Sequence, residues 1–336
     1  MSSLTGQKLL VAGGAGYIGA HVCKAVAEAG GVPVTLDDLS AGHEHAVRWG
    51  PLERVDLRER DATLATLAKH ADATAVIHLA SSIEVGRGER DPAGFYDNNV
   101  LGALNLLHGM RAAGLDRLVF SSTCATYGDD HPMPLTEDCV QDPVSVYGKT
   151  KLAIEHMIQS FHAAYGLSYV TFRYFNACGA DASGLIGEEH EPETHLIPLA
   201  IRAALHPKPD GAPSLKVFGT DYDTPDGTCL RDYVHVADIA RAHILALAAM
   251  QNGLDAAELN IGTGKGRSVL EIIRGVEAAT DRPLPYSEAP RRPGDIPALY
   301  ADPARAREAI GFEAAHSDID SIIRSAVAFH AAQGTP

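Results

Sequence analysis

A glycine-rich loop near the start of the chain joins the apolar run KLLVAGG to the helical pattern GAHVCKAVAEAG. Its glycines are Gly13, Gly16 and Gly19, in the spacing G-x-x-G-x-x-G. A strand, a glycine turn and a helix in this order let a dinucleotide pyrophosphate approach the backbone at the helix N-terminus. Gly13 permits the tight turn, Gly16 the approach of the phosphates, and Gly19 the close packing of helix on strand. The loop therefore predicts a nucleotide-binding α/β fold.

A carboxylate follows the loop at the distance that this fold requires. The second apolar run, VPVTL, ends at Asp37, 18 residues after Gly19. A carboxylate at that point accepts hydrogen bonds from the adenosine ribose hydroxyls and repels a 2′-phosphate. The neighbouring Asp38 either shares this role or caps the following loop. We therefore expect NAD, rather than NADP, as the cofactor.

The first half of the chain alternates short apolar runs with helical patterns. These predict strands at 8–14, 32–38, 74–80, 117–123 and 168–176, and helices at 19–30, 62–70, 98–114 and 146–166. The apolar runs are continuous, which is typical of strands that are buried on both faces by helices. The expected fold class is therefore α/β, a doubly wound Rossmann-type parallel sheet.

The pattern changes after Asn176. Residues 179–230 are rich in Gly, Pro, Asp and Glu, whereas residues 232–250 return to a strand followed by a helix. Residues 265–336 contain another helix, a proline-rich loop and a last amphipathic helix. We expect a Rossmann domain at 1–176, which 231–262 rejoins, and a smaller C-terminal substrate-binding lobe interleaved from 177–230 and 263–336.

Composition excludes several other classes of protein. The formal net charge of −15 argues against a nucleic-acid or anionic-membrane binder. The five cysteines form no C-x-x-C pair and the 16 histidines show no H-E-x-x-H spacing, so we expect neither disulfides nor a metal site. No window approaches the ~20 apolar residues of a membrane helix, and the first residues lack a secretory pattern. The expected location is the reducing cytoplasm.

The stretch VYGKTK contains the residues that point to chemistry. Among the 11 tyrosines, only Tyr147 is followed by a lysine four residues later, Lys151. The two side chains lie on one face of the predicted helix, where an ammonium lowers the pKa of a phenol. A shift from ~10 to near 7 corresponds to roughly 4 kcal/mol. The pair therefore predicts a general base that removes a proton from a sugar hydroxyl.

Hydroxyl groups precede this pair at the end of a predicted strand. The run LVFSSTCATYG places Ser121, Ser122 and Thr123 at the carboxyl edge of the sheet, where ligands bind in such folds. Thr123 lies 24 residues before Tyr147. A hydroxyl there can form a hydrogen bond with the reacting oxygen beside the tyrosine.

Taken together, these segments resemble the extended short-chain dehydrogenase/reductase family, and within it the UDP-glucose 4-epimerases. The resemblance rests on GGAGYIG, YDNNVLGALNLL, FSSTCATYG, YGKTKLAIE, RYFNACGA, GTCLRDYVHVADIARAH and RRPGDIPA, which span nearly the whole chain. It implies transient oxidation of a UDP-sugar at C4 by tightly held NAD, followed by return of the hydride to the opposite face. It also implies a homodimer that pairs the helices around 97–113 and 147–165.

The resemblance carries over residue by residue. Tyr147 matches the base, Lys151 the residue that tunes it and binds the nicotinamide ribose, and Thr123 the hydroxyl at the sugar. Cofactor contacts are expected from Gly13, Gly16, Tyr17, Ile18, Gly19, Asp37, Asp56, Leu57, Leu79, Ala80, Asn99, Ser121, Tyr147, Lys151 and Tyr174. Substrate contacts are expected from Thr123, Tyr147, Asn176, His195, Leu196, Phe218, Arg231, Tyr233, Arg292, Asp295 and Leu299. Arg231 and Arg292 are the permanently charged, bidentate donors that a diphosphate requires in an acidic protein.

Three positions depart from the family pattern. Ile83 stands where a lysine is common, and His195 where an asparagine is common, so that His195 is either a phosphate donor or a structural histidine. Leu299 is intermediate in size at the sugar end of the pocket, so acceptance of N-acetylated sugars is left open.

Three alternative functions share parts of this pattern. A nucleotide-sugar dehydratase needs acid and base groups after the hydroxyl, where this chain has Cys124 and Ala125. A non-catalytic NAD-binding regulator is expected to lose Tyr147 or Lys151, and both are present. A UDP-xylose/UDP-arabinose 4-epimerase differs only around C5 of the sugar and stays open beside UDP-glucose/UDP-galactose.

Overall fold

The computed structural model describes residues 4–292 and 295–333, so that Pro293 and Gly294 of the RRPGDIPA segment lie outside the described residues. Seven parallel strands form the main sheet: β1 (Lys8–Ala12), β2 (Val32–Asp37), β3 (Leu52–Arg54), β4 (Ala75–His78), β5 (Arg117–Thr123), β6 (Ser168–Tyr174) and β10 (Ala256–Ile261). Their spatial order is β10-β6-β5-β4-β1-β2-β3. Chain order reverses between β1 and β4, which is where ligands bind in doubly wound sheets. The predicted fold class is confirmed, and β3 is a strand that the sequence patterns did not predict.

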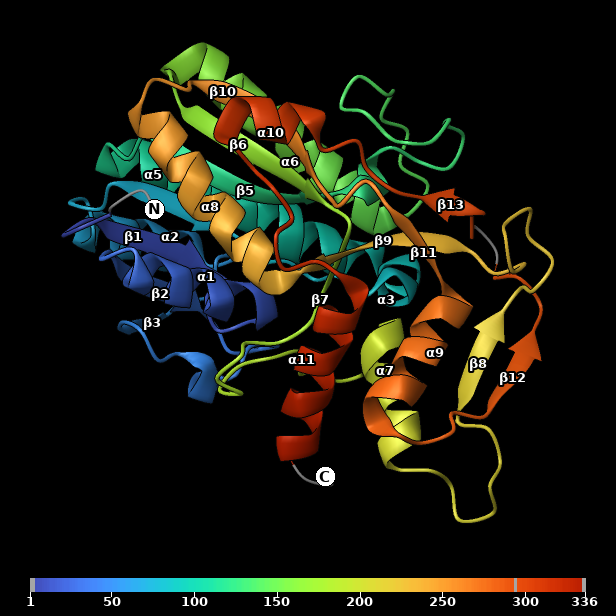
Figure 1. The fold of residues 1–336 in the computed structure, drawn as a ribbon. Helices are drawn as coiled ribbons and strands as arrows, with labels where there is room; N and C mark the ends of the chain where they lie inside the picture. Colours follow the sequence, from blue (N-terminus) through green and yellow to red (C-terminus); the bar gives the residue numbers. More distant parts are fainter. Residues whose placement is uncertain (1–3, 293–294, 334–336) are drawn as a thin grey trace.

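Helices cover both faces of this sheet (Figure 1). One face carries α1 (Tyr17–Glu28), α8 (Val236–Gln251) and α10 (Ala304–Ile310), and the other carries α2 (Arg60–Lys69), α5 (Gly102–Ala113) and α6 (Val146–Tyr165). Side chains alternate between the faces of a strand, so a continuous apolar run supplies both cores. In β1, Leu9 and Val11 join the first core, whereas Leu10 and Ala12 join the second.

Short irregular elements connect the strands on the side of the sheet where the site lies. They are η1 (Glu44–Ala46), α3 (Val85–Arg90), α4 (Pro92–Phe95), the π-helical η2 (Tyr96–Leu101) and η3 (Cys124–Thr126). The long helix α6 is fixed at both ends. The Ser145 hydroxyl accepts a hydrogen bond from Gly148 N at its start, and Gly166 ends it with a φ of 72°. These are the side-chain cap and the left-handed glycine that typically bound a helix.

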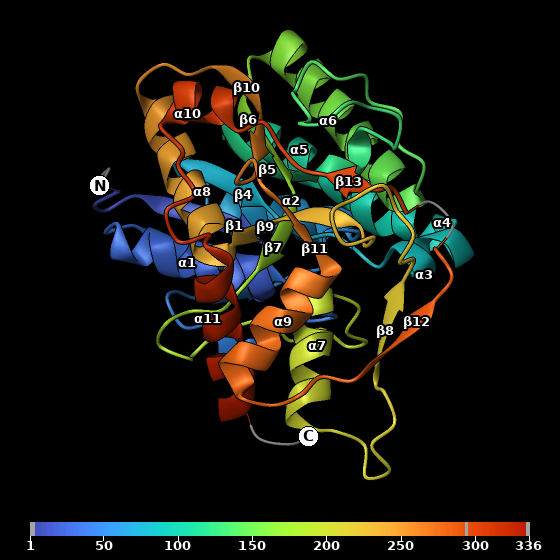
Figure 2. The same ribbon diagram turned by 45° about the vertical axis from the view of Figure 1, so that its right-hand side comes forward.

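A second group of elements lies below the sheet in Figures 1 and 2. The helices α7 (Leu196–Leu205), α9 (Val269–Thr280) and α11 (Ile319–Ala332) pack on one another. Two parallel strands, β8 (Leu215–Phe218) and β12 (Tyr286–Ala289), lie beside them. These elements share a separate apolar core that includes Ile201, Ile272 and Ile323.

A small sheet connects the two groups of elements. It consists of β7 (Asn176–Cys178), β9 (Leu230–His235), β11 (Gly266–Ser268) and β13 (Ala298–Leu299). The segment 231–262 is therefore divided, because β9 belongs to this sheet whereas α8 and β10 pack with the seven-stranded sheet. None of the helices within 4–292 and 295–333 is long and apolar enough to cross a membrane.

Candidate active site

The glycine loop lies between the end of β1 and the start of α1. Gly13 has a φ of +83°, and a Cβ built on it would lie 2.5 Å from Ala80 N, while a Cβ on Gly19 would collide with Gly13 O. Neither position tolerates a side chain without a shift of the backbone. A Cβ on Gly16, by contrast, would meet only Gly13 O, at 3.4 Å. The loop is thus closed against the protein at Gly13 and Gly19, and open at Gly16.

The surroundings of this loop fit a dinucleotide. Gly16 is the N-cap of α1, no side chain caps it, and the first turn carries no acidic residue. The N–H groups there suit an anion, which the helix dipole also favours. The Ser81 hydroxyl is buried without a hydrogen-bond partner, directly after Leu79 and Ala80. The residues present therefore fit the pyrophosphate and ribose groups of NAD.

Asp37 joins the end of β2 to the glycine loop. Its Oδ2 accepts a hydrogen bond from Ala15 N at 3.0 Å, and its Oδ1 accepts one from Leu39 N at 2.9 Å. Burial raises the pKa of this carboxyl, and the hydrogen bonds from the two N–H groups lower the pKa by less. The carboxylate is therefore held in place by the backbone, at the edge where an adenosine ribose would lie.

The other predicted cofactor residues all lie at strand ends or in the first turn of α1. Tyr17 and Ile18 begin α1, Asp56 and Leu57 follow β3, Leu79 and Ala80 follow β4, Ser121 lies in β5, and Tyr174 ends β6. Asp56 is held by Arg58 Nη2 at 2.6 Å, which lowers the pKa of this carboxyl. The Tyr174 hydroxyl bonds with His243 Nε2 at 2.7 Å. The Tyr17 hydroxyl donates to Gly179 O at 2.5 Å.

Asn99 lies outside these strand ends, in η2, and its amide group forms hydrogen bonds with the protein. Its Oδ1 accepts a hydrogen bond from Ser82 N at 2.8 Å, and its Nδ2 donates to Ser82 O at 3.1 Å and to Thr150 Oγ1 at 3.0 Å. The π-helical turn η2 points this fully buried side chain inward. Asn99 therefore ties the loop after β4 to α6, beside the predicted catalytic residues.

Tyr147, Lys151 and Thr123 come together where β5 ends and α6 begins. Lys151 Nζ lies 5.9 Å from the centre of the Tyr147 ring, one helical turn away. The same Nζ donates a hydrogen bond to Ser121 O at 2.7 Å. Thr123 is the last residue of β5, and its hydroxyl acts on Tyr147 through a hydrogen bond that lowers the pKa of the phenol. The predicted catalytic residues thus share one edge of the sheet.

Burial dominates the proton affinities of this pair. It raises the pKa of Tyr147 to about 12, against the lowering by Thr123. It lowers the pKa of Lys151 to about 7, although the charge of Glu155 raises it. The ammonium therefore loses its proton before the phenol does, so helix spacing alone does not produce a phenolate, contrary to the sequence-based argument. A bound nicotinamide cation would supply a second positive charge beside the phenol and favour the phenolate.

Glu155 is a site residue that the sequence analysis missed. It lies one further turn along α6, and its side chain is 1% exposed. Arg173 Nη2 donates to its Oε2 at 2.7 Å, Gln141 Nε2 donates to the same oxygen at 3.1 Å, and the Ser122 hydroxyl donates to its Oε1. The signal was in the printed sequence, since Tyr147, Lys151 and Glu155 are spaced by four within YGKTKLAIE.

Five of the predicted substrate residues fall into two clusters. In the first, Arg231 Nη2 lies 3.4 Å from Asp295 Oδ1, and Leu299 is the register partner of Arg231 between β13 and β9. In the second, the Arg292 guanidinium lies over the Phe218 ring, 4.0 Å from its centre. The charge of Arg231 also lowers the pKa of the Cys124 thiol, which burial raises to about 12, so the first cluster lies near the end of β5.

Asn176 and Tyr233 pair across β7 and β9 in the small sheet. His195 is the N-cap residue of α7 and Leu196 is its first residue. His195 Nδ1 lies 2.7 Å from Glu188 Oε1 and 3.2 Å from Glu193 Oε1. Burial lowers the pKa of this imidazole, but the two carboxylates outweigh it and raise the pKa to about 10. These carboxylates are contacts that the sequence did not predict.

Comparison with known proteins decides the family. The profile described as "NAD dependent epimerase/dehydratase family" matches residues 9–262. The UDP-glucose 4-epimerase of Rhizobium leguminosarum bv. trifolii is 47% identical over 328 residues, which cover 98% of each chain. The chain belongs to the UDP-glucose 4-epimerase family. It is therefore an NAD-dependent epimerase.

Solved structures agree with this membership of the family. The UDP-glucose 4-epimerase from Brucella ovis in complex with NAD is 48% identical with a TM-score of 0.92, covering 96% of this chain and 98% of that one. The enzyme from Stenotrophomonas maltophila, with bound NAD and formylated UDP-arabinopyranose, is 36% identical with a TM-score of 0.92, covering 97% and 98%. In these family members, as in this chain, NAD is the cofactor.

Proposed function

We propose that the protein interconverts UDP-glucose and UDP-galactose by inverting C4 of the sugar. The observation that supports this most strongly is the placement of Tyr147, Lys151 and Thr123 at one sheet edge, beside a glycine loop that fits a dinucleotide. When bound there, NAD would supply reversible hydride transfer at C4 of the sugar, so no external redox partner is required.

The side chains of the protein supply the proton transfer. Tyr147 takes the proton of the sugar 4-hydroxyl as C4 is oxidised, and gives it back when C4 is reduced. Thr123 holds the reacting oxygen beside the phenol. Lys151, fixed by the Ser121 carbonyl, adds positive charge that favours the phenolate. The nearby Glu155 carboxylate favours the charged form of this lysine.

We infer that the diphosphate is held apart from the reacting sugar. Arg231 and Arg292 supply two permanent cations in a chain of net charge −15. Asn176 and Tyr233 line the same small sheet as Arg231. Held by its diphosphate alone, the 4-keto sugar can turn over and present its other face. In this division of labour residues 1–176 hold NAD, whereas 177–230 and 263–336 hold the UDP group together with Asn176 and the β9 residues Arg231 and Tyr233.

The test is to incubate the purified protein, without added NAD, with UDP-galactose and separately with UDP-xylose, and to identify the sugars by NMR. We expect UDP-glucose from the first incubation and little change in the second. Conversion of UDP-xylose alone would assign the protein to pentose substrates and keep the mechanism. No conversion of either substrate, even with NAD supplied, would refute the proposed substrates.

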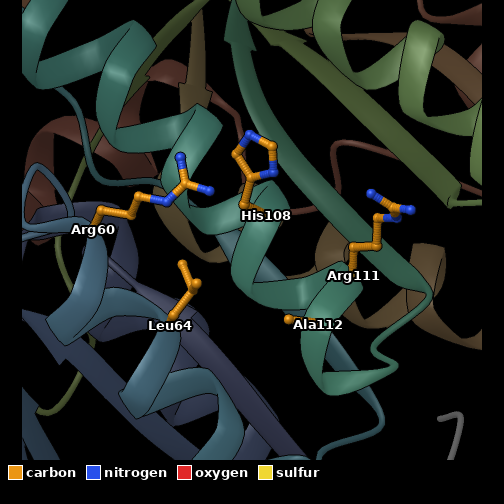
Figure 3. A pocket seen from close by; sticks show the side chains of 5 residues that line it. All are labelled: Arg60, Leu64, His108, Arg111 and Ala112. Carbon is orange, nitrogen blue, oxygen red and sulfur yellow. The ribbon is translucent and has the colours of Figure 1, made fainter.

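We also propose a homodimer formed through the helices around 97–113 and 147–165. A surface hollow of about 370 Å³ lies between α2 and α5, where Arg60 and Leu64 lie across from His108, Arg111 and Ala112 (Figure 3). A second hollow of about 120 Å³ lies between α5 and α6 and is lined by Leu107, Met110, Arg111, Gly114, Leu115, Asp116, Phe161, Tyr165 and Leu167. A second copy of this surface would bury the apolar side chains around them.

Light scattering after gel filtration tests the dimer. We expect twice the chain mass for the unmodified protein and a monomer for Leu101→Glu, because Leu101 is 41% exposed on this surface. Val140→Glu is the matched control, since Val140 is 72% exposed outside both helices and should leave the mass unchanged. A monomeric unmodified protein would refute the proposal.

A further inference from the structure

The segment that precedes α7 gathers four metal-ligating side chains, of which only His195 is among the expected substrate contacts. They are Glu188, His190, Glu193 and His195, and one ligand atom from each lies within 4.8 Å of all the others. The spacing E-x-H-x-x-E-x-H is not the H-E-x-x-H helix motif, so it gave no signal in the sequence. The four residues lie on a loop, and only the folded segment brings their nitrogen and oxygen atoms together.

Four distances between the imidazole nitrogens and the carboxylate oxygens lie between 2.7 and 3.9 Å. His190 Nδ1 lies 3.2 Å from Glu188 Oε1 and 3.9 Å from Glu193 Oε2. His195 Nδ1 lies 2.7 Å from Glu188 Oε1 and 3.2 Å from Glu193 Oε1. Four ligand atoms about 2.0–2.1 Å from a tetrahedral zinc ion are about 3.3 Å apart. A central cation would have to draw in ligand atoms that now lie up to 4.8 Å apart.

Burial and charge favour a divalent ion at this place. The Glu188 and Glu193 side chains are 4% and 2% exposed, so two carboxylates are withdrawn from water side by side. A buried carboxylate requires a compensating charge or a metal. One divalent cation with two neutral imidazoles balances the two negative charges, and it would replace the proton that the carboxylates otherwise favour on His195. His190 Nδ1 is a buried atom with no well-aligned hydrogen bond, and it faces Glu188 Oε1 at 3.2 Å, so in its deprotonated form its lone pair points toward the carboxylates.

We propose that Glu188, His190, Glu193 and His195 bind one divalent metal ion of the zinc type. Imidazole nitrogen and carboxylate oxygen are ligands that zinc accepts in tetrahedral sites. Four protein ligands fill the coordination shell, so the site is structural rather than catalytic. The proposal replaces the expectation, drawn from spacing alone, that the chain has no metal site.

The position of the site indicates what the ion would do. The Tyr17 ring in the first turn of α1 lies edge-on to His190, with centres 6.2 Å apart. His43 Nε2 lies 2.9 Å from Glu189 O, within the same segment. The ion would thus fix the segment before α7 against the residues around the glycine loop. Coordination through Nδ1 leaves His195 Nε2 as an N–H donor at the start of α7.

The experiment uses the full chain without a histidine tag, stripped with EDTA and then dialysed. Zinc is titrated in by calorimetry, bound zinc is counted by mass spectrometry, and cobalt(II) is added separately to record its visible absorption. Glu188→Gln and His190→Gln are the test variants. Glu189→Gln and His206→Gln are matched controls, because neither residue belongs to the four.

We expect one zinc per unmodified chain and the intense visible absorption of tetrahedral cobalt. Each test variant should bind zinc at least about tenfold more weakly, since even outer-shell changes at metal sites cost that much. The two controls should match the unmodified chain. Less than stoichiometric binding, octahedral cobalt, or equal losses in the controls would overturn the proposal. If a test variant does not fold, the stoichiometry and spectrum of the unmodified chain decide. None of these results depends on the epimerase activity.

Discussion

Replacement of Lys151 by methionine tests how the base is activated. Lys151 Nζ lies 5.9 Å from the centre of the Tyr147 ring. At an effective dielectric constant of ~20, a charge at that distance favours the phenolate by about 3 kcal/mol. This corresponds to about 2 pKa units for the phenol. The variant keeps an unbranched side chain, one atom shorter, but lacks the charge.

The prediction requires Lys151 to keep its proton while the phenol ionises, a state that the charge of Glu155 favours. Loss of that ammonium then raises the pKa of Tyr147, so the phenolate forms only at higher pH. We expect the acid limb of the rate–pH profile to move upward by about 2 units, and the rate at a pH on that limb to fall about 100-fold. The assay is conversion of UDP-galactose at saturating substrate and added NAD from pH 5.5 to 10, with bound NAD measured in the same samples.

Lys149→Met is the matched control, because Lys149 is exposed on the same helix two residues earlier. It should leave the profile in place. An unshifted acid limb in Lys151→Met, with NAD still bound, would refute the electrostatic argument. An equal shift in Lys149→Met would show that the effect comes from the net charge of the surface.

Three further predictions concern the base, the buried ion pair and the glycine loop. Tyr147→Phe should retain NAD and lose about 10²–10⁴-fold in turnover, measured in the same assay, because the general base is gone. Glu155→Gln leaves the buried Arg173 without its counter-ion, and should lower the free energy of unfolding in urea by about 3–5 kcal/mol. Gly19→Ala forces a Cβ against the glycine turn. It should lower the free energy of unfolding in urea by about 1–3 kcal/mol and should also weaken NAD binding.

Each of these three predictions has a matched control. The Tyr165→Phe variant, changed at the exposed end of α6, should convert substrate at the normal rate. A nearly normal rate in Tyr147→Phe would contradict the assignment of Tyr147 as the base. Glu155→Leu combined with Arg173→Met removes both charges and should recover most of the lost stability. Gly86→Ala places a Cβ with no contact nearer than 3.7 Å, so a loss as large as that of Gly19→Ala would argue against the steric explanation.

The sheet was predictable from the sequence because its signals are local. A strand buried on both faces must be continuously apolar, and KLLVAGG and RLVFSST satisfy this rule without reference to any other segment. The short strand β3 was not predictable, because Leu52–Arg54 carries one apolar residue and is defined by its pairing with β2. The proximity of Arg231, Asp295 and Leu299 likewise depends on the pairing of β9 with β13.

The sequence by itself determined the nucleotide loop, the cofactor class and the helix face that carries Tyr147 and Lys151, because each depends on residues within about one element of one another. Only the tertiary structure decided the proton affinities, since burial raises the pKa of Tyr147 to about 12 and lowers that of Lys151 to about 7. It also decided the grouping of Glu188, His190, Glu193 and His195, because a loop has no periodicity from which the directions of its side chains can be read. Desolvation and loop geometry depend on what the rest of the chain places around a residue, and that is fixed only when the chain folds.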